Sequence, residues 1–289
     1  MAEDYAFKIV FNLIRIPLKM TDTDPISIDR FDDDLLQDIP TEEDYAATAY
    51  DQRDGEMTAL HNPKAVVYML HGWDFFKNHS PGLSFQPAVA YVRAALRGRG
   101  VEVLAPYYNT HESHFYAGAN LVRDHEGQRK PKDNVHFFGY SMGGLVARQA
   151  VAQGIPPRSL TTFATPNEGT GWWVPNGIPF NNGAASMFGN ANDLTVLNSR
   201  DEEYRNRYTT YGFWYRGAMN SVHDNDGMIE QQSANMMGQS VRPGQAYKLK
   251  YGLEGWFKPI AEPHGDVQNL EHIKPALNRF IRDQVLPSL

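Results

Sequence analysis

A serine with glycine two residues before it and two residues after it stands at Gly139-Tyr-Ser-Met-Gly143. Glycine lacks a Cβ atom, so it permits a sharp reversal of the chain that would crowd a larger residue. A serine at such a bend projects its hydroxyl away from the backbone, where it can attack an acyl carbon. Residues 135–138 before the motif have the apolar pattern of a strand, and residues 145–153 after it have the pattern of a helix. Strand, motif and helix in this order predict that Ser141 is a catalytic nucleophile.

A serine hydroxyl is a weak nucleophile at neutral pH, so a histidine has to accept its proton. In this arrangement the histidine lies beyond both the serine and the acidic residue along the chain. His264 and His272 are the two histidines in that position. His264 lies between Pro263 and Gly265 in a predicted loop, whereas the amphipathic pattern of the last helix accounts for His272 without chemistry. We therefore favour His264 as the base and keep His272 as the alternative.

A carboxylate that orients this histidine is expected between the serine and the histidine. Asp224-Asn-Asp-Gly227 follows a predicted strand and offers two candidates. Asp226 is favoured because Gly227 permits the tight turn that aims a carboxylate inward, and Asp224 is the alternative. A calcium site is the competing interpretation of these residues, but the rest of an EF-hand loop is missing, so no metal is predicted.

Attack on a carbonyl creates an oxyanion, which backbone N–H groups stabilise by a few kcal/mol each. Met142 offers one such N–H through its place directly after the serine. His71-Gly72-Trp73 follows a predicted strand, and we expect the second N–H to come from Trp73. A plain turn at the end of that strand is the alternative interpretation of His71-Gly72.

Strand and helix patterns alternate along the chain from residue 65 onward. Strands are predicted at 65–70, 101–105, 135–138, 160–164, 211–219 and 246–253, and helices at 84–97, 115–124, 145–153 and 267–281, where Pro275 is expected to kink or restart the helix. This alternation predicts an α/β fold with a doubly wound, mostly parallel sheet flanked by helices, in a single domain that spans residues 1–289.

Two segments depart from this alternation. Residues 5–18 are rich in β-branched and aromatic residues and are predicted to form an early strand. Residues 170–207 mix aromatic side chains with glycine, asparagine and proline without a clear period. We predict that they form a lid-like insertion or the wall of an acyl pocket, with a structural excursion packed on the core as the alternative.

Composition excludes several classes of protein. With 289 residues and 42% hydrophobic content, the chain can bury one large core. A net charge of −7 argues against a nucleic-acid partner, and the absence of cysteine excludes disulfides and thiolate chemistry. We expect no cofactor, no transmembrane segment and a cytoplasmic location, with export after loss of a leader as the alternative. The oligomeric state is not predicted.

Four segments of the sequence resemble the bacterial lipase branch of the α/β hydrolases. Residues 66–73 resemble the oxyanion strand and loop of that family, and residues 135–148 resemble its nucleophile strand, elbow and helix. Ala164-Thr-Pro-Asn-Glu-Gly-Thr170 is similar to a Thr-Pro-x-x-Gly-Ser/Thr segment after the next strand, and Asp226-Gly-Met-Ile229 is similar to the segment that holds the acid. The resemblance covers residues 65–234 well and the C-terminus loosely.

By this resemblance, Ser141, Asp226 and His264 would form a catalytic triad, with Trp73 and Met142 at the oxyanion hole. His71, Gly72, Gly139 and Gly143 would be the motif residues that shape the site. The resemblance implies a carboxylic-ester hydrolase of the lipase or esterase kind, acting on small-molecule or lipid esters through an acyl-enzyme. A thioesterase, polyester depolymerase or acyltransferase would use the same triad, and a binding module without catalysis is the remote alternative.

Overall fold

The structure is a computed structural model, and it describes residues 63–73, 85–110, 115–128, 134–170, 185–187, 191–214, 229, 231–236, 246–250 and 268–289. Its strands are β1 (Ala65–Leu70), β2 (Val101–Leu104), β3 (Val135–Tyr140), β4 (Ser159–Phe163), β5 (Tyr208–Trp214) and β6 (Ala246–Lys250). They form one six-stranded sheet in the order β2-β1-β3-β4-β5-β6, and every neighbouring pair is parallel. The predicted doubly wound parallel sheet is confirmed.

The strand order reverses between β1 and β3. From β1 the chain moves outward to the edge strand β2, returns to β3 on the other side of β1, and then proceeds outward to β6. The carboxyl ends of β1 and β3 are level, since Leu70 is paired with Gly139. Loops that leave adjacent strands in opposite directions open a crevice at this point, where α/β proteins bind ligands. The fold therefore brings the segments after Leu70 and after Tyr140 side by side.

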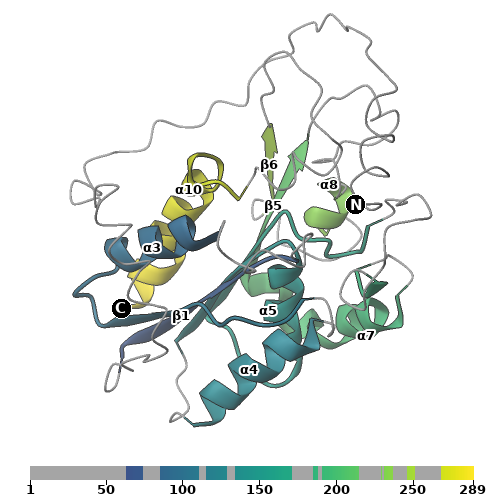
Figure 1. Ribbon diagram of the computed structural model, residues 1–289, viewed down its shortest axis with the longest axis horizontal. Helices are drawn as coiled ribbons and strands as arrows, with labels where there is room; N and C mark the ends of the chain where they lie inside the picture. The colour runs from purple at the N-terminus through teal and green to yellow at the C-terminus, as the bar shows by residue number, and fades with distance from the viewer. Residues whose placement is uncertain are drawn as a thin grey trace, which may run out of the picture.

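Helices cover both faces of the sheet (Figure 1). One face carries α3 (Gln86–Ala95) and α10 (Leu270–Arg279), and the other carries α4 (Tyr116–Gly127), α5 (Met142–Ala152) and α7 (Asn192–Arg200). Alternate residues of β1 point to the two faces: Ala65, Val67 and Met69 join one hydrophobic cluster, and Val66, Tyr68 and Leu70 join the other. A strand buried on both sides has to be apolar throughout, which explains the unbroken run in β1.

Several element boundaries differ from the predicted ones by a few residues, and three of the differences concern α5, β5 and the C-terminal helix. Helix α5 begins at Met142, directly after the serine, and β5 begins at Tyr208 rather than at residue 211. Helix α10 continues through Pro275 into a π-helical segment at Phe280–Val285 and a 3-10 turn at Leu286–Ser288. Proline removes one N–H···O=C bond, and the fully buried side chains on either side of it hold the helix against that loss.

The predicted insertion at 170–207 contains ordered helix in its described part. Helix α7 and the 3-10 helix η3 (Glu202–Arg207) occupy its second half, and the Leu194 and Leu197 side chains are buried in the core. This half is a structural element packed on the sheet layer. Residues 171–184 and the early strand predicted at 5–18 lie outside the described residues, so the lid remains a prediction.

None of the helices within the described ranges has both the length and the apolar character required to cross a bilayer.

Candidate active site

Ser141 occupies a sharp bend between β3 and α5. Its backbone angles are φ 51° and ψ −125°, a strained conformation for a residue with a side chain. Two backbone bonds hold it there: its N–H donates to the Phe163 carbonyl at 2.9 Å, and its carbonyl accepts from the Gly144 N–H at 3.0 Å. The rigid bend lies at the N-terminus of α5, where the helix dipole favours negative charge.

The two glycines of the motif are required by close backbone approach. A Cβ atom at Gly139 would lie 2.5 Å from the Gly143 carbonyl carbon, because the bend folds the helix start back onto the strand end. A Cβ atom at Gly143 would lie 2.1 Å from the Leu70 carbonyl oxygen and 2.7 Å from the His71 carbonyl oxygen. Contacts below 3.0 Å with backbone atoms cannot be relieved by a rotamer change. The spacing of the motif thus reflects the contact of the elbow with itself and with the end of β1.

The loop after β1 lies directly against the serine. A Cβ atom at Gly72 would lie 2.9 Å from the Ser141 Cβ, so the Gly72 backbone is in contact with the serine side chain. Trp73, the predicted second oxyanion donor, is the next residue, and Met142 is the first residue of α5. The structure brings together the loop with one predicted donor, the helix start with the other, and the predicted nucleophile.

His71, the first residue of this loop, has a buried side chain. Burial lowers its pKa from 6.5 to about 4, and the bond to the Gly72 carbonyl opposes that change only in part. A neutral imidazole has one N–H donor and one acceptor nitrogen. Nδ1 lies 2.9 Å from the Gly72 carbonyl oxygen, which can only accept, so Nδ1 carries the proton. His71 is therefore a neutral donor to the Gly72 carbonyl in the loop after β1.

Most of the candidates for the acid and the base lie outside the described residues. Asp224, Asp226 and His264 lie outside the described residues, so their roles remain predictions. His272 lies in the first turn of α10, where its Nε2 is 3.1 Å from a Glu271 carboxylate oxygen and its side chain is 30% exposed. Pairing with a neighbour on the helix surface agrees with the structural interpretation of His272. The choice between the two histidines stays open.

No protein-family model matches the sequence, and no curated protein sequence matches it. Among solved structures, the mature form of Bacillus licheniformis lipase BlEst2 is similar at 15% identity and a TM-score of 0.45, over 77% of this chain and 95% of that chain. The propeptide form of the same lipase is similar at 15% identity and a TM-score of 0.47, over 75% of this chain and 51% of that chain. This chain thus spans about half the length of the propeptide form. The N-acyl homoserine lactonase AidH, complexed with N-butanoyl homoserine, is similar at 17% identity and a TM-score of 0.44, over 77% of this chain and 90% of that chain.

The chain's own geometry identifies the fold. A parallel sheet with this strand order carries a strained serine between a strand and a helix, beside a His-Gly loop from the neighbouring strand. The fold is the α/β-hydrolase fold. Within it, Ser141 lies at the bend between β3 and α5 where the nucleophile is predicted, and residues 71–73, called the oxyanion loop below for their predicted role, follow β1.

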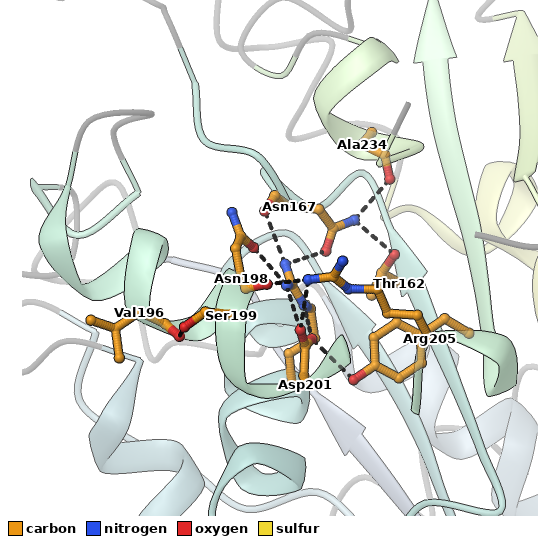
Figure 2. Close-up of polar contacts among 10 residues, drawn as sticks. Thr162, Asn167, Val196, Asn198, Ser199, Asp201, Arg205 and Ala234 are labelled. Atoms are coloured by element: carbon orange, nitrogen blue, oxygen red, sulfur yellow. Dashed lines mark hydrogen bonds and ion pairs between the residues drawn. The ribbon is translucent and has the colours of Figure 1, made fainter. Parts of the chain in front are cut away.

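A buried ion pair lies behind the elbow, on the helix that the serine begins. Arg148 and Asp201 are both fully buried, and the guanidinium Nε donates to a carboxylate oxygen at 2.6 Å while Nη2 donates to the other at 3.2 Å. Nη2 also donates to the Asn198 side chain at 2.6 Å, and the Tyr208 hydroxyl donates to Asp201 at 3.1 Å. These bonds join α5, the end of α7 and the start of β5, and Figure 2 shows the Asn198 and Asp201 side chains of this network. The pair joins the ordered half of the insertion to α5.

Asn167 extends this network to the other side of the site. Arg148 Nη1 donates to the Asn167 carbonyl at 2.9 Å, and the Asn167 amide donates to the Thr162 hydroxyl at 3.1 Å and to the Ala234 carbonyl at 2.8 Å (Figure 2). Ala234 ends α8 (Gln231–Ala234), which follows the segment with the predicted acid. Helix α5, the loop after β4 and α8 are thus joined through one fully buried residue, Asn167.

Sequence reasoning assigned no role to these residues. Arg148 had a usable signal, because a charge inside the apolar run of α5 has to be paired when that helix is buried. Asp201 and Asn167 could be recognised as partners only once the fold was known. Tyr108, which contacts His71, has no local signal, since 37 residues separate the two along the chain.

Proposed function

We propose that this protein hydrolyses carboxylic esters, with Ser141 as the nucleophile and a covalent acyl-enzyme as the intermediate. One observation carries the proposal: a strained serine at the start of α5 touches the backbone of a His-Gly loop from the adjacent strand. This arrangement supplies a nucleophile beside N–H groups suited to an oxyanion, which acyl transfer requires.

In the proposed reaction, His264 accepts the Ser141 proton as the serine oxygen attacks the ester carbonyl carbon. The Trp73 and Met142 N–H groups stabilise the tetrahedral oxyanion. Collapse of this intermediate breaks the bond to the alcohol oxygen, which takes the proton from the imidazolium and departs. Water then attacks the acyl-enzyme by the same route and releases the acid. Asp226 orients His264 and stabilises its charged form.

The substrate class we propose is an ester with an apolar acyl group. The support is the apolar and aromatic content of residues 170–207, which include Trp172, Trp173, Phe180 and Phe188. A thioester or polyester substrate would use the same nucleophile, so the assay has to compare leaving groups.

Turnover of a chromogenic short-chain ester by the wild type and by Ser141→Ala tests the proposal. We expect the substitution to lower kcat by about 10⁴-fold or more, because the covalent route is lost. Ser159→Ala is the matched control: this buried serine also contacts a histidine, with its hydroxyl 2.7 Å from His136 Nδ1, but it lies at the opposite end of the strands. Equal activity in the wild type and in Ser141→Ala, or no turnover of esters and thioesters by either, would overturn the proposal.

A fluorophosphonate probe followed by peptide mapping tests the nucleophile without a known substrate. We expect label on Ser141 in the wild type and none in the Ser141→Ala variant. Repeating the ester assay with His264→Ala and His272→Ala identifies the base, since only one of the two should lower kcat to the level of Ser141→Ala. Asp226→Asn and Asp224→Asn resolve the acid in the same way.

A further inference from the structure

Tyr108 holds the buried His71 from three directions. Its ring is stacked on the imidazole, with 4.0 Å between the ring centroids and 12° between the planes. Its hydroxyl donates to the His71 carbonyl, and its backbone N–H points to the His71 Nε2 at 3.4 Å. Tyr108 follows β2, so these contacts join the loop after the edge strand to the loop after β1.

The backbone contact of Tyr108 agrees with the protonation of His71. Because Nδ1 donates to the Gly72 carbonyl, Nε2 is the acceptor nitrogen of the neutral ring. The Tyr108 N–H is a donor and meets that acceptor. Donor and acceptor are thus matched at both ring nitrogens, which fixes the orientation of the imidazole and its tautomer.

These contacts pin two successive peptide groups of the oxyanion loop. Tyr108 holds the group between His71 and Gly72 through the His71 carbonyl, and the imidazole holds the group between Gly72 and Trp73 through the Gly72 carbonyl. In a trans peptide the C=O and N–H point in opposite directions within one plane. Fixing the Gly72 carbonyl on the imidazole therefore aims the Trp73 N–H away from it.

We propose that Tyr108 is a positioning residue that, through His71, aims the Trp73 N–H at the oxyanion formed on Ser141. The inference rests on the proposed function, because it concerns a donor for that reaction. It requires a Tyr108 ring that cannot drift, and the ring is confined: a Cβ atom at Gly118 of α4 would lie 3.0 Å from two of its carbon atoms. Oxyanion donors act through preorganisation, so a donor whose peptide can rotate loses part of its effect.

Tyr108→Phe tests this role, because phenylalanine keeps the stacked ring and the backbone N–H and removes only the hydroxyl. Complete loss of an oxyanion donor lowers kcat by about 10²–10³-fold. For a donor that is loosened rather than lost, we expect kcat to fall by about 10-fold. KM should be unchanged because the ground-state contacts remain. Tyr68→Phe is the matched control: this buried tyrosine belongs to the same hydrophobic cluster and is stacked on Phe137 at 5.4 Å and 18°, but its hydroxyl donates to Glu126 and contacts His125 instead. We expect Tyr68→Phe to keep the wild-type kcat.

Histidine-selective nitrogen NMR gives a readout that does not depend on turnover. In the wild type we expect the His71 ring to stay neutral and protonated on Nδ1 down to about pH 5, as its pKa of about 4 requires. In Tyr108→Leu, which removes the stacked ring as well as the hydroxyl, we expect the His71 pKa to rise toward 6.5.

The outcomes separate the two proposals. Wild-type kcat in Tyr108→Phe, an equal loss in Tyr68→Phe, or unchanged His71 titration in Tyr108→Leu would overturn the positioning role, while Ser141-dependent turnover would leave the proposed function standing. If the wild type shows no Ser141-dependent turnover, the proposed function fails and the positioning role fails with it.

Discussion

Two buried polar networks lie beside the elbow, and they differ in charge. The network at the oxyanion loop is neutral and aromatic: the imidazole and the Tyr108 hydroxyl donate to the carbonyls of Gly72 and His71, and the Tyr108 ring and N–H contact the imidazole. The network behind the elbow is charged, and the contacts of Arg148, Asp201 and Asn167 join α5, the loop after β4, the junction of α7 with η3, and α8. One network orients single peptide groups, and the other fastens whole elements.

The difference follows from the directionality and the strength of the two kinds of interaction. A stacked ring with one hydrogen bond contributes little binding energy but defines an angle narrowly, which suits a donor that has to point at one atom. A buried ion pair is strong at short range and costly to break, which suits segments that are distant along the chain. We therefore expect damage to the first network to appear in kcat and damage to the second to appear in stability.

Asp201→Asn should produce the largest loss of stability. The substitution leaves the Arg148 guanidinium buried without its counter-charge, which costs about 3–5 kcal/mol in comparable cases. Urea unfolding of the variant and the wild type measures the difference. Asp283→Asn is the control, because its ion pair with Arg282 is about half exposed, and such pairs contribute less than about 1 kcal/mol.

A double replacement separates charge from volume in the same network. Arg148→Met combined with Asp201→Leu removes the two charges of this pair and leaves only the buried Arg205, 3.5 Å from the Asp201 carboxylate, without its counter-charge. Asp201→Asn alone leaves both Arg148 and Arg205 unpaired, so the double variant should be less destabilising. An Asp201→Asn variant as stable as the wild type, or a folded variant with kcat lowered as much as in Tyr108→Phe, would contradict the division of roles between the networks.

Acid should destabilise the folded protein at two buried histidines, one of which lies in the network at the oxyanion loop. Burial lowers the pKa of His71 from 6.5 to about 4, and burial followed by the charge of Arg158 lowers that of His136 to about 4. Between pH 6.5 and 4 the unfolded chain binds protons at these positions that the folded chain does not. The contribution of the two neutral histidines to the free energy of unfolding is therefore fully present above pH 6.5. It is lost as the pH drops through this window, by about 3 kcal/mol per histidine at most.

Substitution by asparagine isolates the share of each histidine. His71→Asn and His136→Asn should each flatten the dependence of unfolding free energy on pH, measured by urea titration from pH 7.5 to 4.5. Only His71→Asn should also lower kcat, because His136 contacts Ser159 and Asn134 at the other end of the strands. Unchanged slopes in both variants would mean that each histidine has the same pKa in the folded and the unfolded chain, which would contradict the prediction.

Most of the sheet could be predicted from local patterns, because a strand buried on both faces is an apolar run and a helix packed on the sheet has an amphipathic period. The β1 strand was predicted to the residue, since Pro63 and Gly72 bound an apolar run with no ambiguity. The start of α5 was placed three residues too late, because Gly143 and Gly144 are poor helix formers that tertiary contact requires at this position.

The candidate site was predictable where the backbone path itself makes the site. The sharp bend at Ser141 and the close backbone contacts at Gly72, Gly139 and Gly143 agree with the spacing of the motif, because a tight bend requires glycines at fixed positions. Tyr108 was not found, because stacking between residues that are distant along the chain depends on how β1 and β2 are placed in the sheet. Local periodicity predicts the elements, whereas orientation of side chains across elements needs the assembled fold.

Gly143→Ala should have the smallest effect on stability of these changes and still reveal the contact between the two sides of the site. Its Cβ atom would meet the Leu70 and His71 carbonyl oxygens, so the elbow and the oxyanion loop have to move apart, at about 1–3 kcal/mol for an overpacked site. Gly127→Ala is the matched control, because it ends α4 with nothing within 4 Å of the new Cβ atom and should be neutral or slightly stabilising. We expect Gly143→Ala to fold and to lose most of its kcat, since the displaced loop carries Trp73. A folded Gly143→Ala variant with wild-type kcat would show that the close contact of elbow and loop serves folding alone, and the contrast between an orienting network and a fastening network would then not hold.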